Sequence, residues 1–570
     1  MEGEDPFNPT LQAARDLQQH HATEAGPPRL LLARSDSLLS WFKSIERRIS
    51  NPSPEAAKAA EWLTDNDYVL RRVIRSVDKD IPASFYRKLP RLAQPEYGGL
   101  PRIWFVARGA LDAVEMQPAF NSLSTFMSAY QEGQELTIAE LWALPTMLRL
   151  ACLETLIAAC EELFPGLKAP FDIERLDGWA SRHDPTETVA RSITALSALA
   201  ALPWKDFFDL TSRVDAALRR DPAGVYGGMD FASRDLYRKA VEDLGRGSGQ
   251  VETEVVRRAI GKSEAMPHDP RRGHVGYWLI GSGRAELENE LGYRAPLASR
   301  HLRWIRARAR PVYFTALILF VVAALLLPAD ILLSRGAGPA AFLGGILLSI
   351  VPAGIIAVTL THWLVTLILP PSTLPKLDFE ADLPDGVRAV VAVPVIFRNA
   401  GEVSRLLEQA ETNWLTNPVH NLRFVLLSDF ADAAEPSLPS DAAILAALRT
   451  GIDLLNSRYP DFRPFVLLHR QRRFNAADGV WMGWERKRGK LSEFNDFLAT
   501  GNGSAFPVQM GDADSLIGTP YVITTDADTI LPPGAAHRLL GALVHPLNRA
   551  EFDDSGRLKE GYTFIQPRVE

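Results

Sequence analysis

The sequence is poor in cysteine and has no excess of basic charge. Only two cysteines occur among 570 residues, and both lie on an apolar helical face shared with Leu153, Leu156 and Ile157. This pattern predicts that Cys152 and Cys160 are reduced core residues, not a disulfide or metal ligands. The net charge is −7 and the pI is about 6.0, so we expect no general binding of nucleic acid.

An apolar signal region is also missing. The first ten residues, MEGEDPFNPT, are acidic and polar, which does not indicate secretion by cleavage. Residues 1–28 are polar and contain proline, and we expect a disordered lead-in there. The whole chain is 46% hydrophobic and 23% charged, which allows several cores and is too apolar for a mostly disordered protein.

Charged residues are nearly absent between Pro311 and Pro375, where only Asp330 and Arg335 occur. Two apolar runs in this interval are each long enough to cross a hydrocarbon layer about 30 Å thick. We therefore predict a membrane region over residues 300–375 with two transmembrane helices; the alternative is a buried soluble hairpin. The runs are Val312–Leu333 and Ala340–Leu369, and His362 and Trp363 near the second exit are expected to be interfacial anchors.

Arginine is concentrated immediately before the first apolar run. Arg300, Arg303, Arg306, Arg308 and Arg310 stand there, whereas the turn between the runs carries Arg335 alone. Because positive residues are retained on the cytoplasmic side, this asymmetry predicts that both flanking domains are cytoplasmic.

Residues 29–299 predict a mainly helical cytoplasmic domain. Leu70, Val73, Ile74 and Val77 repeat at i, i+3, i+4, i+7, and β-branched alternation is rare. The stretch Gly245–Gln250 is expected to be a flexible loop between helices. Its glycines do not follow a strand, so they do not predict a phosphate cradle.

Strand and helix patterns alternate over residues 385–570. Nearly continuous β-branched runs separated by amphipathic stretches predict a doubly wound α/β sheet. Ligands of such sheets bind beyond the carboxyl ends of the strands, where Asp429 would emerge from the second strand. The predicted strands are Arg388–Phe397, Leu422–Ser428 and Pro464–His469, and the predicted helices are Glu402–Glu411 and Asp441–Leu455.

A further β-branched run, in YVITTDADT (residues 521–529), stops on two aspartates. Side chains at i and i+2 leave a strand on the same face, so Asp526 and Asp528 would project together. Mg²⁺ takes oxygen ligands, holds one or two protein carboxylates and leaves positions for substrate phosphates. The pair therefore suggests a nucleotide-sugar site; the alternative is that the aspartates cap the next predicted helix, Ala535–Val544.

A basic cluster precedes the aspartate run, in WMGWERKRGKLSEFN (residues 481–495). Its charges enter a helix whose backbone N–H groups add positive potential, an environment that suits a diphosphate. The alternative is a solvated basic face. Trp481 and Trp484 favour a site, because aromatic faces suit sugar rings. The cluster comprises Arg486, Lys487, Arg488 and Lys490 around Gly489.

Together with the ending GYTFIQPRVE, these segments resemble the cyclic β-1,2-glucan synthase family of membrane glycosyltransferases. The resemblance extends to the amino-terminal part of that family and covers most of the chain. The segments that carry it there are Glu61–Leu63, Leu136–Leu150, Asp221–Ala240 and His274–Gly283.

The resemblance implies an inverting transferase of the GT-A type, with a Rossmann-like fold, in a bacterial inner membrane. It implies UDP-glucose as donor, Mg²⁺ or Mn²⁺ as cofactor and a growing β-1,2-glucan as product. Asp429 would contact the uridine, and Lys490 and Asn495 would lie near the diphosphate and ribose. Asp526 and Asp528 would hold the metal, with Asp528 the better candidate for direct ligation.

Two expected features of related processive transferases do not occur in these residues. An acceptor-activating aspartate and a Gln-x-x-Arg-Trp motif follow the aspartate pair in those enzymes, so we expect the general base beyond Glu570. The chain is thus expected to bind donor without full activity and to act with the remainder of a larger synthase. The alternatives are a noncatalytic membrane scaffold or regulatory module, and an enzyme using another nucleotide sugar.

Overall fold

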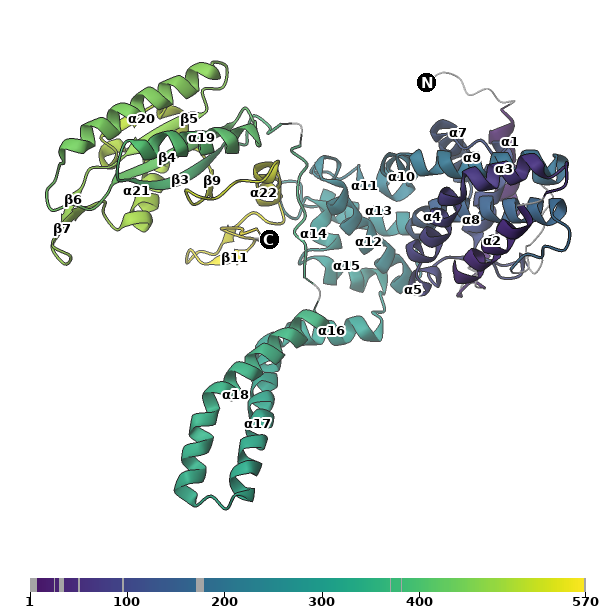
Figure 1. Ribbon diagram of the computed structural model, residues 1–570, viewed down its shortest axis with the longest axis horizontal. Helices are drawn as coiled ribbons and strands as arrows, with labels where there is room; N and C mark the ends of the chain where they lie inside the picture. The colour runs from purple at the N-terminus through teal and green to yellow at the C-terminus, as the bar shows by residue number, and fades with distance from the viewer. Residues whose placement is uncertain are drawn as a thin grey trace. The chain divides into compact units, whose positions relative to one another are not determined.

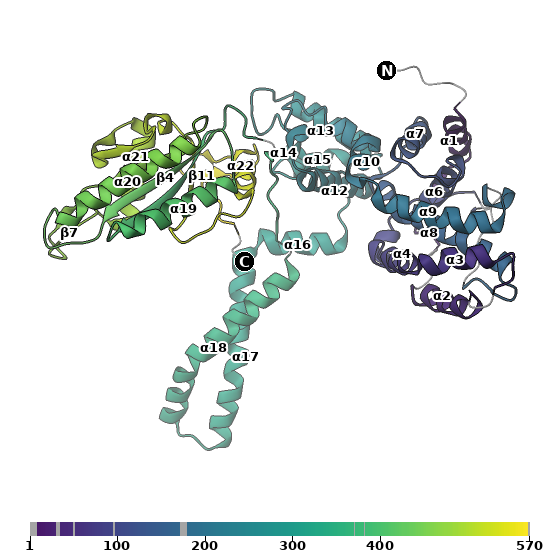
Figure 2. The ribbon, with the colours of Figure 1, turned by 45° about the horizontal axis from the view of Figure 1, so that its top comes forward.

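The computed structural model describes residues 8–24, 26–29, 35–49, 52–94, 97–170, 179–369, 371–380 and 382–567. The chain divides into two compact units. The helical unit comprises described residues within Met1–Gly227 and Asp235–Pro370, and the α/β unit comprises those within Gly228–Arg234 and Pro371–Glu570. Figures 1 and 2 show the helices and strands of each unit.

The helical unit is built around α8 (Ile138–Leu163). This helix begins with a capping box in which Thr137 accepts the amide of Glu140 at 3.2 Å, and the Glu140 carboxylate accepts the amide of Thr137 at 2.9 Å. Glu140 is also buried against Arg102, at 2.6 and 2.8 Å. The surrounding helices are α1 (Pro9–Gln19), α2 (Ser35–Ile49), α3 (Ala57–Asp65), α4 (Asp67–Asp80), α5 (Ala83–Tyr86), α6 (Arg102–Ala113), α7 (Phe120–Tyr130), α9 (Pro185–Ala201), α10 (Trp204–Thr211), α11 (Arg213–Leu218), α12 (Phe231–Ser248), α13 (Glu252–Glu264), α14 (Val275–Leu279) and α15 (Arg284–Leu291), with a short β1 (Thr23–Glu24) paired to β2 (Arg91–Leu92).

The helical interpretation of this region is confirmed, including the two cysteines. Cys152 and Cys160 are free and buried on α8, and burial raises the pKa of each thiol. Four residues of α4 that repeat at helical spacing, Leu70, Val73, Ile74 and Val77, are buried as predicted.

Two sequence predictions in this unit are wrong. The predicted disordered lead-in over residues 1–28 contains α1, because Asn8 caps the helix, Pro9 occupies its first position, and Leu11 becomes buried; residues 1–7 lie outside the described range. The loop predicted over Gly245–Gln250 is helical up to Ser248. A side chain at Gly247 would meet the Tyr293 ring at 2.1 Å, so this glycine permits close packing inside a helix.

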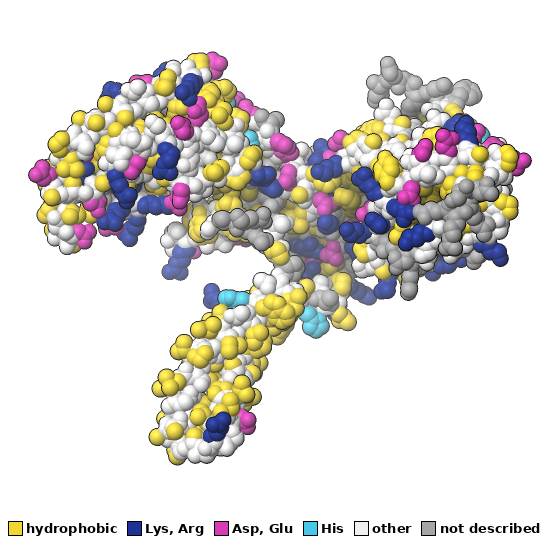
Figure 3. Space-filling model, in the orientation of Figure 1, with side chains coloured by type: hydrophobic (Ala, Val, Ile, Leu, Met, Phe, Trp, Pro, Cys, Tyr) yellow, Lys and Arg dark blue, Asp and Glu magenta, His cyan; other side chains and the backbone are white. Residues whose placement is uncertain are grey.

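A hairpin of two long apolar helices follows, formed by α17 (Ala309–Ser334) and α18 (Pro339–Ile368). No residue of α17 is buried, and the buried residues of α18 are the small Ala353, Ala357 and Thr361. Hydrophobic side chains cover the surface of the hairpin (Figure 3). Both predicted apolar helices are therefore present, and within this chain the hairpin is exposed, not buried. The core helix α8 is also long and apolar enough to cross a membrane, but 78% of its apolar window is buried.

The α/β unit contains a five-stranded sheet in the order β8-β5-β4-β3-β9. Only β8 runs antiparallel to its neighbour. The elements are β3 (Ala389–Phe397), α19 (Gly401–Leu415), β4 (Leu422–Phe430), α20 (Pro439–Arg458), β5 (Phe465–His469), β6 (Arg473–Asn475), β7 (Val480–Met482), α21 (Arg486–Thr500), β8 (Val508–Met510), β9 (Tyr521–Thr524), α22 (Ala535–Val544), β10 (Glu551–Phe552) and β11 (Leu558–Glu560).

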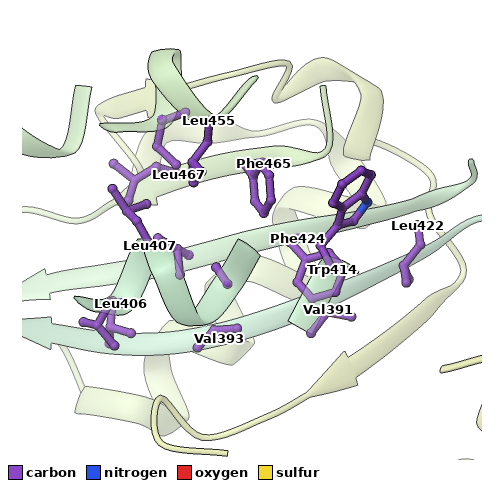
Figure 4. Close-up of a cluster of buried hydrophobic side chains, with 14 of the residues drawn as sticks. Val391, Val393, Leu406, Leu407, Trp414, Leu422, Phe424, Leu455, Phe465 and Leu467 are labelled. Carbon is purple, nitrogen blue, oxygen red and sulfur yellow. The ribbon is translucent and has the colours of Figure 1, made fainter. Parts of the chain in front are cut away.

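Helices cover both faces of this sheet, as predicted. On one face, Leu407 and Trp414 of α19 pack with Val391, Phe424 and Phe465 from three strands (Figure 4). On the other face, apolar residues of α21, including Phe494 and Phe497, pack on alternate positions of the same strands. This two-sided burial explains why β3, β4 and β5 are continuously apolar in sequence.

The strand order reverses between β3 and β9. From β3 the chain passes through α19 to β4 on one side, whereas β9 pairs with β3 on the other. In open α/β sheets, ligands bind beyond the carboxyl ends of the strands at such a reversal. The fold therefore directs attention to the residues that follow β3 and β9.

Candidate functional site

A buried cluster of ionic groups lies at the carboxyl end of β4. The sequence predicted that Asp429 would follow the end of this strand. In the structure Asp429 lies inside β4, which continues to Phe430. Its carboxylate accepts two hydrogen bonds from Arg470, at 2.7 and 2.8 Å, and pairs with Lys490 at 2.9 Å. Arg470 also contacts Glu493 at 2.7 Å, so two cations face two carboxylates. We call these four residues the buried hub.

Burial and neighbouring charges act against each other within the hub. Burial lowers the pKa of Lys490, although the nearby Asp429 charge opposes the shift. For Arg470, burial by itself would lower the pKa, but the hydrogen bonds and charges of Asp429 and Glu493 raise it overall. Lys490 also donates to the carbonyl of Val395 on β3 at 2.6 Å. The hub thereby joins the ends of β3 and β4 to α21.

The loop that leads into α21 is held against this hub. Arg470 donates to the carbonyls of Trp484 and Arg486, at 3.0 and 3.1 Å. A side chain at Gly483 would meet the Asp429 carboxylate at 2.6 Å, so the close approach requires glycine. Glu485 and Arg486 have φ angles of 49° and 46°, a left-handed conformation that non-glycine residues rarely adopt. Such strain persists where the surroundings enforce it, and it is frequent at functional sites.

The two aspartates lie in a turn beyond β9. The strand ends at Thr524, so the alternation of side chains along a strand, from which we expected Asp526 and Asp528 to share a face, does not apply to them. Both side chains are exposed. The capping alternative is also wrong: α22 begins after Gly534, and no side chain caps it.

Lys487 connects the aspartate turn to the basic cluster. Its ammonium group pairs with the carboxylate of Asp526. Arg486 pairs separately with Asp432, beyond the end of β4, at 2.8 Å. Two segments predicted from separate motifs, residues 481–495 and 521–529, therefore meet at the rim of the sheet.

The remaining predicted site residues lie around this junction. Trp481 belongs to β7 and is half-buried beside Phe474, with ring centroids 5.6 Å apart. Trp484 is 45% exposed. Arg488 and Asn495 are exposed on α21, and neither makes a side-chain hydrogen bond or ion pair with the described residues. The structure thus pairs Asp429 with Lys490 and Lys487 with Asp526, whereas Asn495 has no such contact with the described residues.

The aspartate turn offers a partial set of metal ligands. Among the residues that the structure describes, no three side chains of His, Cys, Asp or Glu gather at one point. Two exposed carboxylates nevertheless fit a hard cation whose other positions are filled by phosphate oxygens and water. The donors Asp526 and Asp528 are chemically suited to Mg²⁺ or Mn²⁺. Lys487 pairs with the Asp526 carboxylate.

Sequence reasoning missed Arg470 and Glu493, although they organise the loop. Arg470 follows directly after the buried strand FVLLH, in the position where Asp429 was recognised on the neighbouring strand. The signal available in the sequence was an anion, Asp429, at the end of one buried strand and a cation, Arg470, directly after the neighbouring one. Glu493 had no local signal, because its role arises only when α21 packs on the sheet.

A cavity of about 790 Å³ in the helical unit is a weaker candidate for phosphate binding. Its lining includes Lys88 and Arg246, both paired with Glu242. Arg102 is likewise paired with the buried Glu140. Three of the four cations that line this cavity, Lys88, Arg102 and Arg246, are already neutralised, so the cavity offers little unpaired charge to an anion.

No family model matches the chain. The chain is 31% identical over 594 aligned residues to the cyclic beta-(1,2)-glucan synthase NdvB of Rhizobium meliloti (strain 1021). The match covers 90% of this chain and 21% of that protein, so the chain spans about a fifth of the length of this relative.

Proposed function

Because this chain belongs to the cyclic glucan synthase family, we propose that its α/β unit is a GT-A-type domain that binds UDP-glucose and a divalent cation for β-1,2-glucan synthesis. The observation that carries this proposal is the ion pair between Lys487 and Asp526, which brings the basic cluster and the aspartate pair together. Their junction lies beyond the strands that flank the reversal of strand order, where α/β sheets bind nucleotides.

Each group has a distinct task in this proposal. Asp528 and Asp526 would hold Mg²⁺ or Mn²⁺, and the bound cation would neutralise charge on the leaving diphosphate. Lys487, with Arg486 and Arg488 nearby, supplies further positive charge at the entry to α21. The exposed face of Trp484 is available to a sugar ring. Asp429 and Lys490 are buried, so they would support the nucleotide through the loop that Arg470 holds and not by direct contact with uridine, diphosphate or ribose.

The overall reaction proposed is an inverting transfer of glucose to a growing glucan, carried out with the remainder of the synthase. The α17–α18 hairpin would cross a bacterial inner membrane, with both units on the cytoplasmic side. This orientation is supported by the arginines before α17 and the single Arg335 in the intervening turn. It would expose the donor site to UDP-glucose made in the cytoplasm.

The test is calorimetric titration of the detergent-solubilised chain with UDP-glucose in the presence and absence of Mn²⁺. We expect cation-dependent binding that Asp528→Asn weakens on the order of 10- to 100-fold, the range seen when groups that support a metal site are removed. Asp554→Asn, which changes an exposed aspartate in the β10–β11 turn of the same unit, is the matched control.

Equal affinity with and without the cation would contradict the proposal. Absence of any nucleotide binding by a folded chain would instead favour the noncatalytic scaffold. Competition by other nucleotide sugars identifies the donor, since an aspartate pair does not specify the hexose.

A further inference from the structure

An amphipathic helix, α16 (Leu297–Ala307), precedes the apolar hairpin. Leu297 and Trp304 lie two turns apart on one face and are 71% and 53% exposed. Arg308 leaves the helical conformation, with φ −118° and ψ 34°, and so separates α16 from α17. Both ribbon views show α16 running across the direction of the α17–α18 hairpin, at the end away from the interhelical turn (Figures 1 and 2).

The arginines of this segment have three different environments. Arg308 lies over the ring of Trp304, with its guanidinium carbon 5.3 Å from the ring centroid. Arg303 makes two hydrogen bonds to Glu288 of α15, at 2.6 and 2.8 Å, which ties α16 to the helical unit. Arg300, Arg306 and Arg310 are exposed, and none of them has an acidic partner among the described residues. Uncompensated cations therefore stand beside exposed apolar side chains at the base of an apolar hairpin.

We propose that α16 lies in the membrane interface and that its Arg300 and Arg306, together with Arg310 in the first turn of α17, bind headgroup phosphates of anionic phospholipids. Guanidinium groups bind phosphate by paired hydrogen bonds, and juxtamembrane cations are attracted to anionic leaflets. Leu297 and Trp304 insert among the adjoining acyl chains, as apolar faces of interfacial helices do. Through the Arg303–Glu288 contact, the same helix fixes the helical unit to the bilayer surface.

The apolar residues identify the occupant. Free phosphate or a nucleic acid could satisfy the three arginines, but neither would cover Leu297 and Trp304. A phospholipid supplies both chemistries, and α16 lies at the lipid boundary because α17 follows it after the single residue Arg308. The inference rests on the proposed membrane crossing of the hairpin, but not on the proposed transferase activity.

Native mass spectrometry of the full chain, purified with equimolar phosphatidylglycerol and phosphatidylcholine, tests the proposal. We expect wild type to retain phosphatidylglycerol preferentially. The triple variant Arg300→Gln/Arg306→Gln/Arg310→Gln should lose roughly a hundredfold in this preference, at about fivefold per arginine. The control Arg72→Gln/Arg75→Gln/Arg87→Gln removes three exposed arginines elsewhere in the helical unit and should change nothing.

Equal retention of the two lipids by wild type, or an undiminished preference in the triple variant, would overturn the proposal. If the glutamine variant does not fold, Arg300→Lys/Arg306→Lys/Arg310→Lys replaces it, because this variant keeps the positive charge. A salt titration of wild type then measures the electrostatic part of the preference for phosphatidylglycerol, which must fall as salt rises. Flotation with vesicles of either lipid separately reports membrane insertion of the hairpin, so failure of the crossing is distinguishable from failure of the headgroup site.

Discussion

Both units contain a buried network of charged side chains, but only one network reaches an exposed ligand-binding candidate. In the helical unit, Arg238 is fully buried and donates to Asp215 and Asp209 at 3.0 and 3.1 Å. Nearby, His274 links Asp221 at 2.8 Å to the Tyr237 hydroxyl at 2.7 Å. Asp215 also pairs at 2.7 Å with Arg219, whose side chain is 42% exposed, so this network reaches the surface only as an ordinary ion pair within the helical unit.

The buried hub of the α/β unit contacts the backbone of a surface loop. Arg470 holds the carbonyls of Trp484 and Arg486, and the residues that follow are exposed. The hub therefore fixes a surface loop that carries Lys487 toward Asp526. A buried ionic network that ends in a surface ion pair stabilises a fold, whereas one that holds an exposed, strained loop with charged side chains supports a site.

The strongest test of this contrast is to remove the central arginine of each network. Arg470→Met and Arg238→Met should each destabilise the unit that contains them by up to about 3–5 kcal/mol, because a buried carboxylate loses one of its cationic partners. Scanning calorimetry measures this loss. Only Arg470→Met should also weaken UDP binding, measured well below the unfolding transition, since only Arg470 positions the loop.

Arg238→Met serves as the control for general destabilisation. Wild-type UDP affinity in folded Arg470→Met protein would break the proposed connection between hub and site. A comparable loss of affinity in Arg238→Met would show that global stability, not loop position, controls binding.

The regular elements could be predicted because their signals are local. The apolar runs predicted β3, β5 and both hairpin helices to within a few residues, and α22 spans the predicted Ala535–Val544 residue for residue. Two-sided burial leaves a continuous apolar run in the strands, and apolar exposure leaves long uncharged runs in the hairpin. Such patterns need no knowledge of distant partners.

The errors occurred where a distant partner decides the outcome. Gly247 remains helical because Tyr293 packs against it, and α1 forms around a buried Leu11 within a polar sequence. At the site, the acidic and basic motifs were recognisable, but Arg470 contacts Asp429 across 41 residues of sequence. Long-range pairing of this kind fixes the loop geometry and leaves no periodic signal.

A second test uses a histidine in each unit. His21 and His469 are each 1% exposed, and burial lowers the pKa of both to about 4 from 6.5. The unfolded chain therefore binds a proton first as pH falls below 6.5, and stability is lost progressively until about pH 4. Each histidine should account for up to about 3 kcal/mol of this loss.

Calorimetric transitions of the two units, followed between these pH values, separate the contributions. His21→Phe should flatten the pH dependence of the helical unit alone, and His469→Phe that of the α/β unit alone. An unchanged slope in either variant would mean that the buried histidine is not the group responsible there.

The variant with the smallest expected change in stability, Lys487→Gln, tests the proposed diphosphate contact directly. Lys487 and Asp526 form an exposed ion pair, with side chains 54% and 63% exposed, so Lys487→Gln should alter stability by less than about 1 kcal/mol. If Lys487 contacts the diphosphate, the same variant should bind UDP about tenfold more weakly, the cost of one hydrogen bond to a charged group. Binding of uridine, which has no phosphate, should be unaffected.

Lys559→Gln, which changes an exposed lysine on β11, controls for the change in net charge. Equal losses for UDP and uridine would place Lys487 outside the diphosphate site, because only a contact to phosphate distinguishes the two ligands.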